Sequence, residues 1–214
     1  MHLLQITREV TLENLSSKTL YLILVHKLVA KPTSQNKIEN MLINENIDWK
    51  NVYLSGRATT IDSYGRAFHY KCSQNLLFLN NRLFKFGMTN SSLCSYCKAT
   101  NETTLHLFYS CNKTIQLWTQ LQSHFGNLNL PNISPRSAFL GFDTYDNILV
   151  NQIHLIFRIE IFKLREYGSV NLIYVLKKIE SIRRIETNMS FYNENKKALN
   201  DQKWSMIIDQ LQTA

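Results

Sequence analysis

Apolar residues recur every three or four positions along most of this chain, which is the spacing of one face of an α-helix. In the segment from Leu15 to Ala30, for example, Leu20, Leu24 and Leu28 follow one another at intervals of four. The pattern predicts further helices at about residues 33–42, 64–80, 103–121, 146–167, 172–186 and 193–211. Glycine and proline, which interrupt helices, number only 6 and 3. The sequence therefore predicts a mainly α fold, with the architecture of a helical bundle.

Polar residues at the helix ends supply the expected caps. They are Ser16 or Ser17, Thr33 or Ser34, and Asp62 or Ser63, in chain order. Ser134 and Ser137 predict a short helix ahead of Gly141, and Gly87 is expected to end a helical segment. The residues expected to face inward near the C-terminus are Ile173, Leu176, Ile179, Ile182, Trp204 and Ile208. Part of the run at 146–167 alternates like a strand, but its length favours a largely buried helix.

Three of the four cysteines, Cys94, Cys97 and Cys111, lie within 18 positions, and His106 lies between the last two. The two-residue gap after Cys94 lets both thiolates of a tight turn point at one ion, and His106 and Cys111 can complete a tetrahedron. Three sulfurs and one imidazole favour Zn²⁺ over Mg²⁺, Ca²⁺ or Mn²⁺. The alternatives are ordinary buried cysteines and, less well supported, a disulfide, which would leave one of the three cysteines unpaired.

The chain has 214 residues, enough for one large domain or two small ones. Gly126 to Pro135 is the clearest linker segment. We expect a helical lead-in with the zinc-binding segment at residues 1–125, whose zinc core is 93–118, then a linker at 126–136 and a helical C-terminal tail at 137–214. Because a chain of this length buries a sizeable core, zinc would stabilise a small loop inserted in the bundle and not the whole fold.

Basic residues outnumber acidic ones by 24 to 16, and residues 1–119 carry most of the excess, with 13 basic and 7 acidic groups. A basic domain is a candidate for binding nucleic acid, although many small proteins are equally basic without such a role. The residues that we assign to nucleic-acid contact combine cations with a tyrosine, as phosphate contact and base stacking require. They are Arg57, Arg66, Tyr70, Lys71, Arg82 and Lys85, with His69 in the same stretch. A solvated helix face is the alternative for each of them, and also for Lys177, Lys178, Arg183 and Arg184.

Common catalytic motifs are missing from the sequence. It contains no GxxxxGK, GxGxxG, GxSxG or HExxH motif and no paired-aspartate strand of a polymerase. Glu102, four residues before His106, raises the alternative of a catalytic zinc with a glutamate base. Zinc deaminases place their His-x-Glu element before the cysteine pair, however, and here the order is reversed. Four protein ligands also leave no open coordination position, so we expect a structural metal site and no enzyme.

The segment from Asn80 to Trp118 resembles the C-terminal region of LINE-type (non-LTR) retrotransposon polyproteins. In that family a zinc-binding region follows the reverse transcriptase domain, with the form C-x2-C, Glu-Thr, His-Leu-Phe, Cys and Trp. The corresponding residues here are Cys94, Cys97, Glu102-Thr103, His106-Leu107-Phe108, Cys111 and Trp118. The flanks are similar over about residues 40–210. The resemblance implies an accessory fragment of a retroelement polyprotein that helps the polymerase hold RNA or DNA and has no polymerase or endonuclease active site.

Two functions are consistent with these features. The first is a zinc-stabilised helical module whose partner is RNA or DNA. The second is a structural or protein-interaction module, whose zinc braces a helical tail against the polymerase portion of the same polyprotein. No apolar run reaches the roughly 20 residues that span a bilayer, so we expect no membrane partner. Without a secretory signal, a nuclear or cytoplasmic location is expected.

Overall fold

The chain folds into α-helices joined by short loops. The computed structural model describes residues 16–28, 32–43, 45–142 and 148–212. Within these ranges no residue lies in a β-strand, and an isolated bridge pairs Leu93 with Asn101. The α-helices are α1 (Ser17–Leu28), α2 (Thr33–Met41), α3 (Trp49–Thr59), α4 (Ser63–Ser73), α5 (Asn80–Lys85), α6 (Asn112–His124), α7 (Pro135–Leu140), α8 (Ile148–Leu164), α9 (Leu172–Ser190), α10 (Glu194–Ser205) and α11 (Ile208–Gln212). The prediction of a mainly α fold is confirmed.

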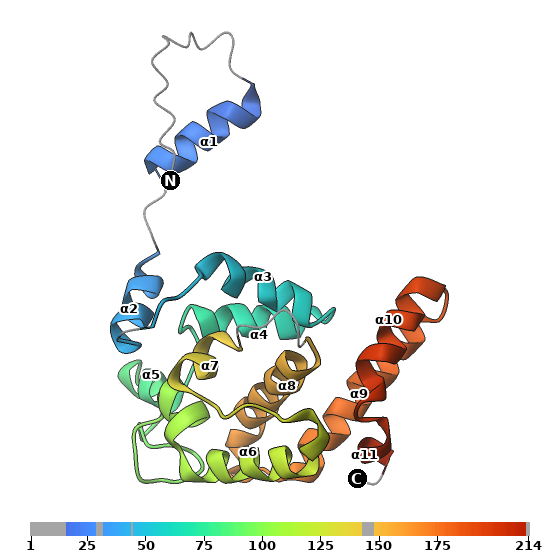
Figure 1. Cartoon of the computed structure of the whole chain (residues 1–214). Helices are drawn as coiled ribbons and strands as arrows, with labels where there is room; N and C mark the ends of the chain where they lie inside the picture. Colours follow the sequence, from blue (N-terminus) through green and yellow to red (C-terminus); the bar gives the residue numbers. More distant parts are fainter. Residues whose placement is uncertain (1–15, 29–31, 44, 143–147, 213–214) are drawn as a thin grey trace.

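Helix α8 is the central element of the bundle. It contacts α3, α4 and α9, and Figure 1 shows it in the middle of the molecule with α6 below it. Twelve of its 17 residues are buried, so it is covered on nearly all sides. A helix buried all round needs no polar face, which explains why its apolar residues do not follow a clean 3.6-residue period. None of the described helices combines the length and apolar character needed to cross a membrane.

One continuous apolar cluster holds the main helices together. It contains Phe68 of α4, Trp118 of α6, Phe157 of α8 and Ile179 of α9. Trp118 packs edge-on against Phe157, with ring centroids 4.8 Å apart. Leu128 and Leu130 of the segment expected to be a linker are buried in the same cluster. The division of the chain into units on either side of residues 126–136 stays a prediction.

The long helix expected from Tyr64 to Asn80 is interrupted, so this prediction is wrong. Helix α4 ends at Ser73, and Asn75 takes a left-handed conformation with φ 50°. Asparagine reaches this region at lower cost than most residues, which lets the chain turn and start α5 at Asn80. As a result Leu77 is buried, and Leu76, which a continuous helix would turn inward, is 45% exposed.

Three of the expected caps are present. Asp62 accepts hydrogen bonds from the amides of Tyr64 and Gly65, and Ser134 forms a reciprocal capping box with Ser137. Ser16 accepts from the amide of Thr19 at the start of α1.

Other details at the helix ends differ from the predictions. Pro32 precedes α2 and no side chain caps that helix, so the cap assigned to Thr33 or Ser34 is wrong. The last helix breaks into α10 and α11, and Ile207 is buried near Trp204 in place of Ile208. Ile173 is 50% exposed because it lies on the outer side of α9.

Candidate metal centre

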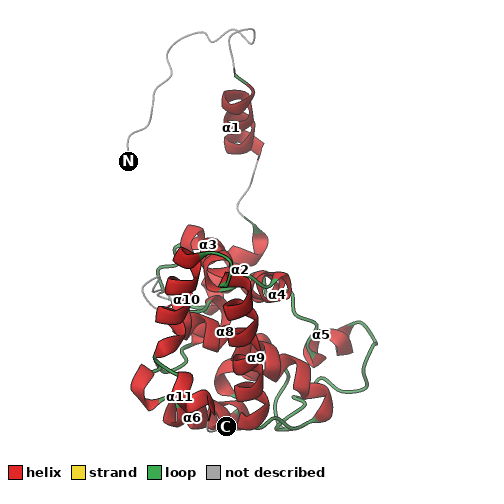
Figure 2. Cartoon of the chain, turned by 90° about the vertical axis from the view of Figure 1, so that its right-hand side faces the viewer, coloured by secondary structure: helices red, strands yellow, loops and turns green. Residues whose placement is uncertain are grey.

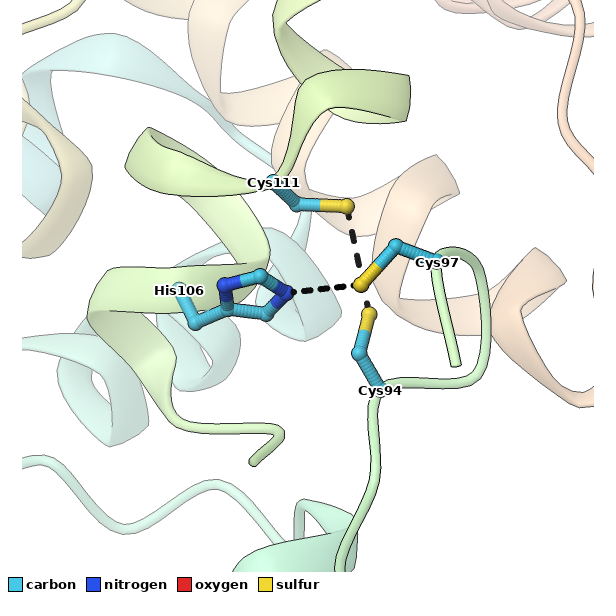
Figure 3. A group of neighbouring side chains, drawn as sticks. All are labelled: Cys94, Cys97, His106 and Cys111. Atoms are coloured by element: carbon cyan, nitrogen blue, oxygen red, sulfur yellow. Dashed lines mark hydrogen bonds between the residues drawn. The ribbon is translucent and has the colours of Figure 1, made fainter. Parts of the chain in front are cut away.

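Two short segments bring four side chains with metal-ligating atoms together. Cys94 and Cys97 lie in a tight turn, and His106 and Cys111 lie at the two ends of the π-helical segment η2 (His106–Ser110). One ligand atom from each residue lies within 4.8 Å of those from the other three. Figure 3 shows the three sulfurs and the imidazole pointing toward one another. The four residues selected from the sequence are therefore neighbours in space.

The turn that carries the first two cysteines is closed by backbone hydrogen bonds. The Cys94 amide donates to the Thr100 carbonyl at 2.8 Å, and the Lys98 amide donates back to the Cys94 carbonyl at 3.0 Å. Lys98 has φ 55°, a conformation that L-residues rarely adopt and that costs on the order of 1 kcal/mol. The reversed chain direction at this residue points both thiols to the same side.

The second pair of side chains is positioned by the wide turn of η2. The Cys111 amide donates to the His106 carbonyl at 2.8 Å, a spacing of five residues. Thr103 anchors the start of the turn, because its hydroxyl accepts from the His106 amide at 3.0 Å. Single π turns occur often at functional sites, where they change the direction of a side chain that a regular helix would fix. The helix predicted at residues 103–121 was expected to be interrupted near Cys111, and this wide turn is the interruption.

The spacing of the ligand atoms can be compared with that around a tetrahedral ion. Zinc–sulfur bonds of about 2.3 Å place two tetrahedral sulfurs about 3.8 Å apart, and a sulfur and a nitrogen about 3.5 Å apart. The Sγ atoms of Cys94 and Cys111 are 3.9 Å apart, and Cys97 Sγ lies 3.3 Å from His106 Nε2. The donor set and its spacing therefore fit a four-coordinate ion that prefers sulfur and nitrogen.

The protonation of the thiols also fits such a centre. Cys94 and Cys111 are fully buried, and a hydrogen bond joins their sulfurs. This contact lowers the pKa of Cys111 below its ordinary value and raises the pKa of Cys94. Because thiolates are the metal-binding form of cysteine, the lowered pKa of Cys111 favours a cation at this position.

The imidazole has a supporting contact of its own. Nε2 of His106 faces Cys97, and Nδ1 lies 3.3 Å from the Ser110 hydroxyl. A histidine that binds metal through one nitrogen commonly donates from the other, which fixes the ring orientation. Ser110 was not selected from the sequence, and only its spacing of four residues from His106 could have suggested this role.

Glu102 supports the turn from the inside. Its side chain is fully buried, and its two oxygens accept from the amides of Asn80 and Ser95 at 3.0 and 2.8 Å. Arg165 neutralises it, with Nη1 lying 3.5 Å from Oε1. The position of Glu102 four residues before His106 raised the alternative of a base at the metal, but its oxygens are held by these three groups and it is not part of the ligand cluster.

Tyr96 and Arg165 fasten the same turn to α8. The Tyr96 hydroxyl donates to the Ile161 carbonyl at 2.6 Å, and the Arg165 guanidinium lies over the Phe162 ring. The sequence did not point to the Tyr96–Ile161 hydrogen bond or to the Glu102–Arg165 ion pair, because they join residues 65 and 63 positions apart. One hydrogen bond thus connects the metal centre to the central helix of the bundle, and one buried ion pair connects it to the residue directly after this helix.

Comparison with known protein families agrees with this geometry. Residues 31–118 match the family described as zinc-binding in reverse transcriptase. The match ends at Trp118 and contains all four clustered ligands, so it supports a reverse-transcriptase zinc-binding region in this part of the chain. No curated protein and no solved structure matches the chain.

The residues assigned to nucleic-acid contact lie on three helices of the zinc-binding region. Arg57 is on α3, Arg66, Tyr70 and Lys71 are on α4, and Arg82 and Lys85 are on α5. All are exposed except Arg82, which is half-buried. Two of the arginines also hold loops: Arg66 donates to the Thr60 carbonyl, and Arg82 donates to the Asn75 carbonyl at 2.6 Å. Their role in nucleic-acid binding stays a prediction.

His69, from the same stretch of the zinc-binding region, is not part of any charged surface. It is 6% exposed, and its ring contacts the Val52 carbonyl through Nε2 at 2.9 Å. Burial, together with the nearby charge of Arg158, lowers the pKa of His69 to about 4. The ring is therefore neutral at physiological pH and cannot pair with a phosphate.

The basic residues of α9 lie outside the zinc-binding region, and two of them are paired. Arg183 and Arg184 both bind Glu180, with nitrogen–oxygen distances of 2.7 and 2.6 Å. These contacts lower the pKa of Glu180 to about 2, through the hydrogen bond from Arg183 first. Part of the positive charge on α9 is therefore neutralised within the helix.

Proposed function

We propose that this chain is a zinc-binding accessory module that binds nucleic acid, of the kind that accompanies LINE-type reverse transcriptases. The observation that carries the proposal is the charge of the sequence around the ligand cluster. From Ser63 to Asn101 the chain contains five lysines and arginines and no aspartate or glutamate. Glu102, which follows, is buried and neutralised by Arg165. The segment that carries the first two ligands therefore contributes positive charge and no negative charge to the surface around the metal centre, as contact with phosphates requires.

Zinc is the ion that the donor set favours, because three sulfurs and one imidazole select a soft tetrahedral cation. Cys94, Cys97, His106 and Cys111 would hold it, and the bound ion would cross-link the turn to η2. Since the turn also contacts α5 through Asn80, this cross-link would fix the orientation of α5. With four protein ligands the ion has no open position, and we propose no catalytic role for it.

The experiment is a titration of the zinc-loaded protein with fluorescently labelled RNA and DNA at increasing salt. Binding should be strongest at about 50 mM salt and should weaken linearly on a double-logarithmic plot, because phosphate contacts release counterions. A protein that binds neither RNA nor DNA at the lowest salt concentration would not have the proposed function.

A second candidate function is protein interaction, in which the module packs against the polymerase portion of its polyprotein. Exposed apolar residues near the end of α9 favour it, since Ile185, Met189, Phe191 and Tyr192 are between 51% and 93% exposed. α1, which stands apart from the bundle in Figures 1 and 2, adds exposed Tyr21. Binding to a purified polymerase domain without any binding to nucleic acid would establish this function in place of the first.

A further inference from the structure

A groove of about 280 Å³ lies between the end of α2, the link from α4 to α5, and α5 itself. It is lined by the buried residues Leu77, Leu79, Glu102 and Thr104, and also by Met41, Asn75, Asn81, Arg82, Lys85 and Thr103. Figure 2 shows α5 and the loop after it projecting from the body of the bundle, so the groove lies beside an accessible part of the molecule. The metal centre is close to the groove, because Asn80 at the start of α5 donates to Ser95 of the metal-binding turn.

The groove presents positive charge without a competing negative charge. Arg82 and Lys85 line it from α5. Glu102 is the single acid among the described lining residues, and Arg165 neutralises it from the opposite side. Arg82 uses one Nη2 contact to the Asn75 carbonyl, which holds the guanidinium at the groove while its other N–H groups stay available. Amide and hydroxyl groups of Asn81 and Thr103 add uncharged donors beside the two cations.

An exposed aromatic ring lies next to these cations. Phe86 is the residue that ends α5, and its amide donates to the Arg82 carbonyl at 3.2 Å, so the two residues lie one helical turn apart. Phe86 is 60% exposed, and Phe84 on the neighbouring face is 50% exposed. Gly87, with φ 68°, ends the helix directly after Phe86.

We propose that this groove holds the backbone of a single nucleic-acid strand. Arg82 and Lys85 bind its phosphates, and Phe86 stacks on an unpaired base. The inference rests on the proposed function and adds the place of contact and the form of the nucleic acid. A single strand fits because an exposed phenylalanine offers no hydrogen bond to a paired base edge, whereas every unpaired base has a face on which an aromatic ring can stack. The groove is also close to the lower end of the roughly 300–1,000 Å³ range of ligand pockets, as one backbone segment requires.

The experiment compares variants of the full zinc-loaded chain in a binding titration. The probes are a labelled single-stranded oligonucleotide of mixed sequence, as RNA and as DNA, and the duplex made from it. R82Q/K85Q removes two phosphate contacts, so the slope of log affinity against log salt should become shallower by about 1.4. K85Q alone should change the slope by about 0.7 and leaves the Arg82–Asn75 contact intact. K196Q/K197Q removes the same charge from α10, on the far side of the bundle in Figure 1, and should leave the slope unchanged.

The stacking contact is tested separately with F86L, which keeps an apolar side chain and removes the aromatic face. It should weaken binding of the single strand by about tenfold and have little effect on the duplex. Full single-strand binding by F86L would overturn the stacking contact.

The controls separate this inference from the proposed function. If R82Q/K85Q and K196Q/K197Q give the same slope, the groove is not the site, although the chain binds nucleic acid. If the unaltered chain binds the duplex as tightly as the single strand, the preference for a single strand is wrong. If it binds no probe at about 50 mM salt, the proposed function itself fails. The unfolding midpoint of each variant shows whether it is folded.

Discussion

The carboxylate of Glu102 lies 3.5 Å from the guanidinium of Arg165, and both side chains are buried, at 0% and 8% exposure. Glu102 comes shortly after the metal-binding turn, and Arg165 comes directly after the last residue of α8, far away in the sequence. The same carboxylate accepts from the amides of Asn80 and Ser95. One acidic side chain therefore connects the turn, the start of α5 and the central helix of the bundle.

We expect Glu102→Gln to destabilise the protein strongly. The glutamine leaves the Arg165 charge unpaired in the interior, and its amino group cannot accept from a backbone amide. Loss of one partner of a buried ion pair costs about 3–5 kcal/mol. Urea unfolding gives the change in free energy, and the double variant with Arg165→Met should recover part of the loss.

The matched control is Arg184→Gln. Arg184 also pairs with a glutamate, but its side chain is 72% exposed, so solvent screens the interaction. Its loss should cost less than about 1 kcal/mol. Equal effects of the two substitutions would mean that the Glu102–Arg165 pair does not support the fold.

Removal of the metal should destabilise the turn and leave most of the bundle folded. The large apolar cluster includes Cys94 and Cys111, but most of its side chains come from the helices around α8, so a chelator should lower the unfolding midpoint and preserve most of the helical circular dichroism signal. Cobalt substitution should give the visible spectrum of a tetrahedral ion with three thiolate ligands. A spectrum that shows a water ligand would point to a catalytic site.

Cys111→Ser should lower the metal content, and Cys72→Ala is its control. Cys72, the fourth cysteine, is fully buried outside the ligand cluster, and burial raises its pKa to about 11. It therefore stays protonated and is not expected to bind metal. Metal analysis should find one ion per chain in Cys72→Ala and less than one in Cys111→Ser, whereas the reverse result would refute the ligand assignment.

His69 makes stability depend on pH. Its pKa is about 4 in the folded chain and about 6.5 in an unfolded one, so the unfolded state binds the proton more readily. The stabilisation from the neutral ring is fully present above pH 6.5. As the pH falls through 4 the free energy of unfolding decreases by about 3 kcal/mol in total. His69→Gln should flatten this part of the profile of stability against pH. His124→Gln changes a half-buried histidine at the end of α6 and should leave the profile unchanged. Parallel profiles for the three proteins would contradict the prediction.

Gly56 is in contact with the same histidine. A Cβ atom at this position would lie 2.6 Å from Cδ2 of His69, which is closer than carbon atoms approach. Gly56→Ala should therefore cost about 1–3 kcal/mol through forced repacking. Gly126→Ala places its methyl group where no atom lies within 4 Å, and it should be neutral or slightly stabilising. Thermal unfolding of the two alanine variants tests the difference.

The sequence by itself determined the local features of this protein. Helical periodicity, the Asp62 and Ser134 caps and the spacing of Cys94, Cys97, His106 and Cys111 are written in residues close together along the chain. Such features can be predicted because capping and a metal-binding turn need only a few neighbouring residues. The same local reasoning failed at Asn75, where one residue in a left-handed conformation divides the expected long helix.

Only the tertiary structure decided which polar side chains are surface groups and which are internal supports. His69 and Glu102 have the sequence context of exposed residues, but the fold buries both of them. The charge state of His69 depends on its burial and on Arg158 of α8, and Glu102 is paired with Arg165 of a distant segment, because burial and long-range contacts are set by the fold. The groove at α5 likewise exists only where α2 and α5 meet, since a pocket is a property of packed surfaces and not of any one segment.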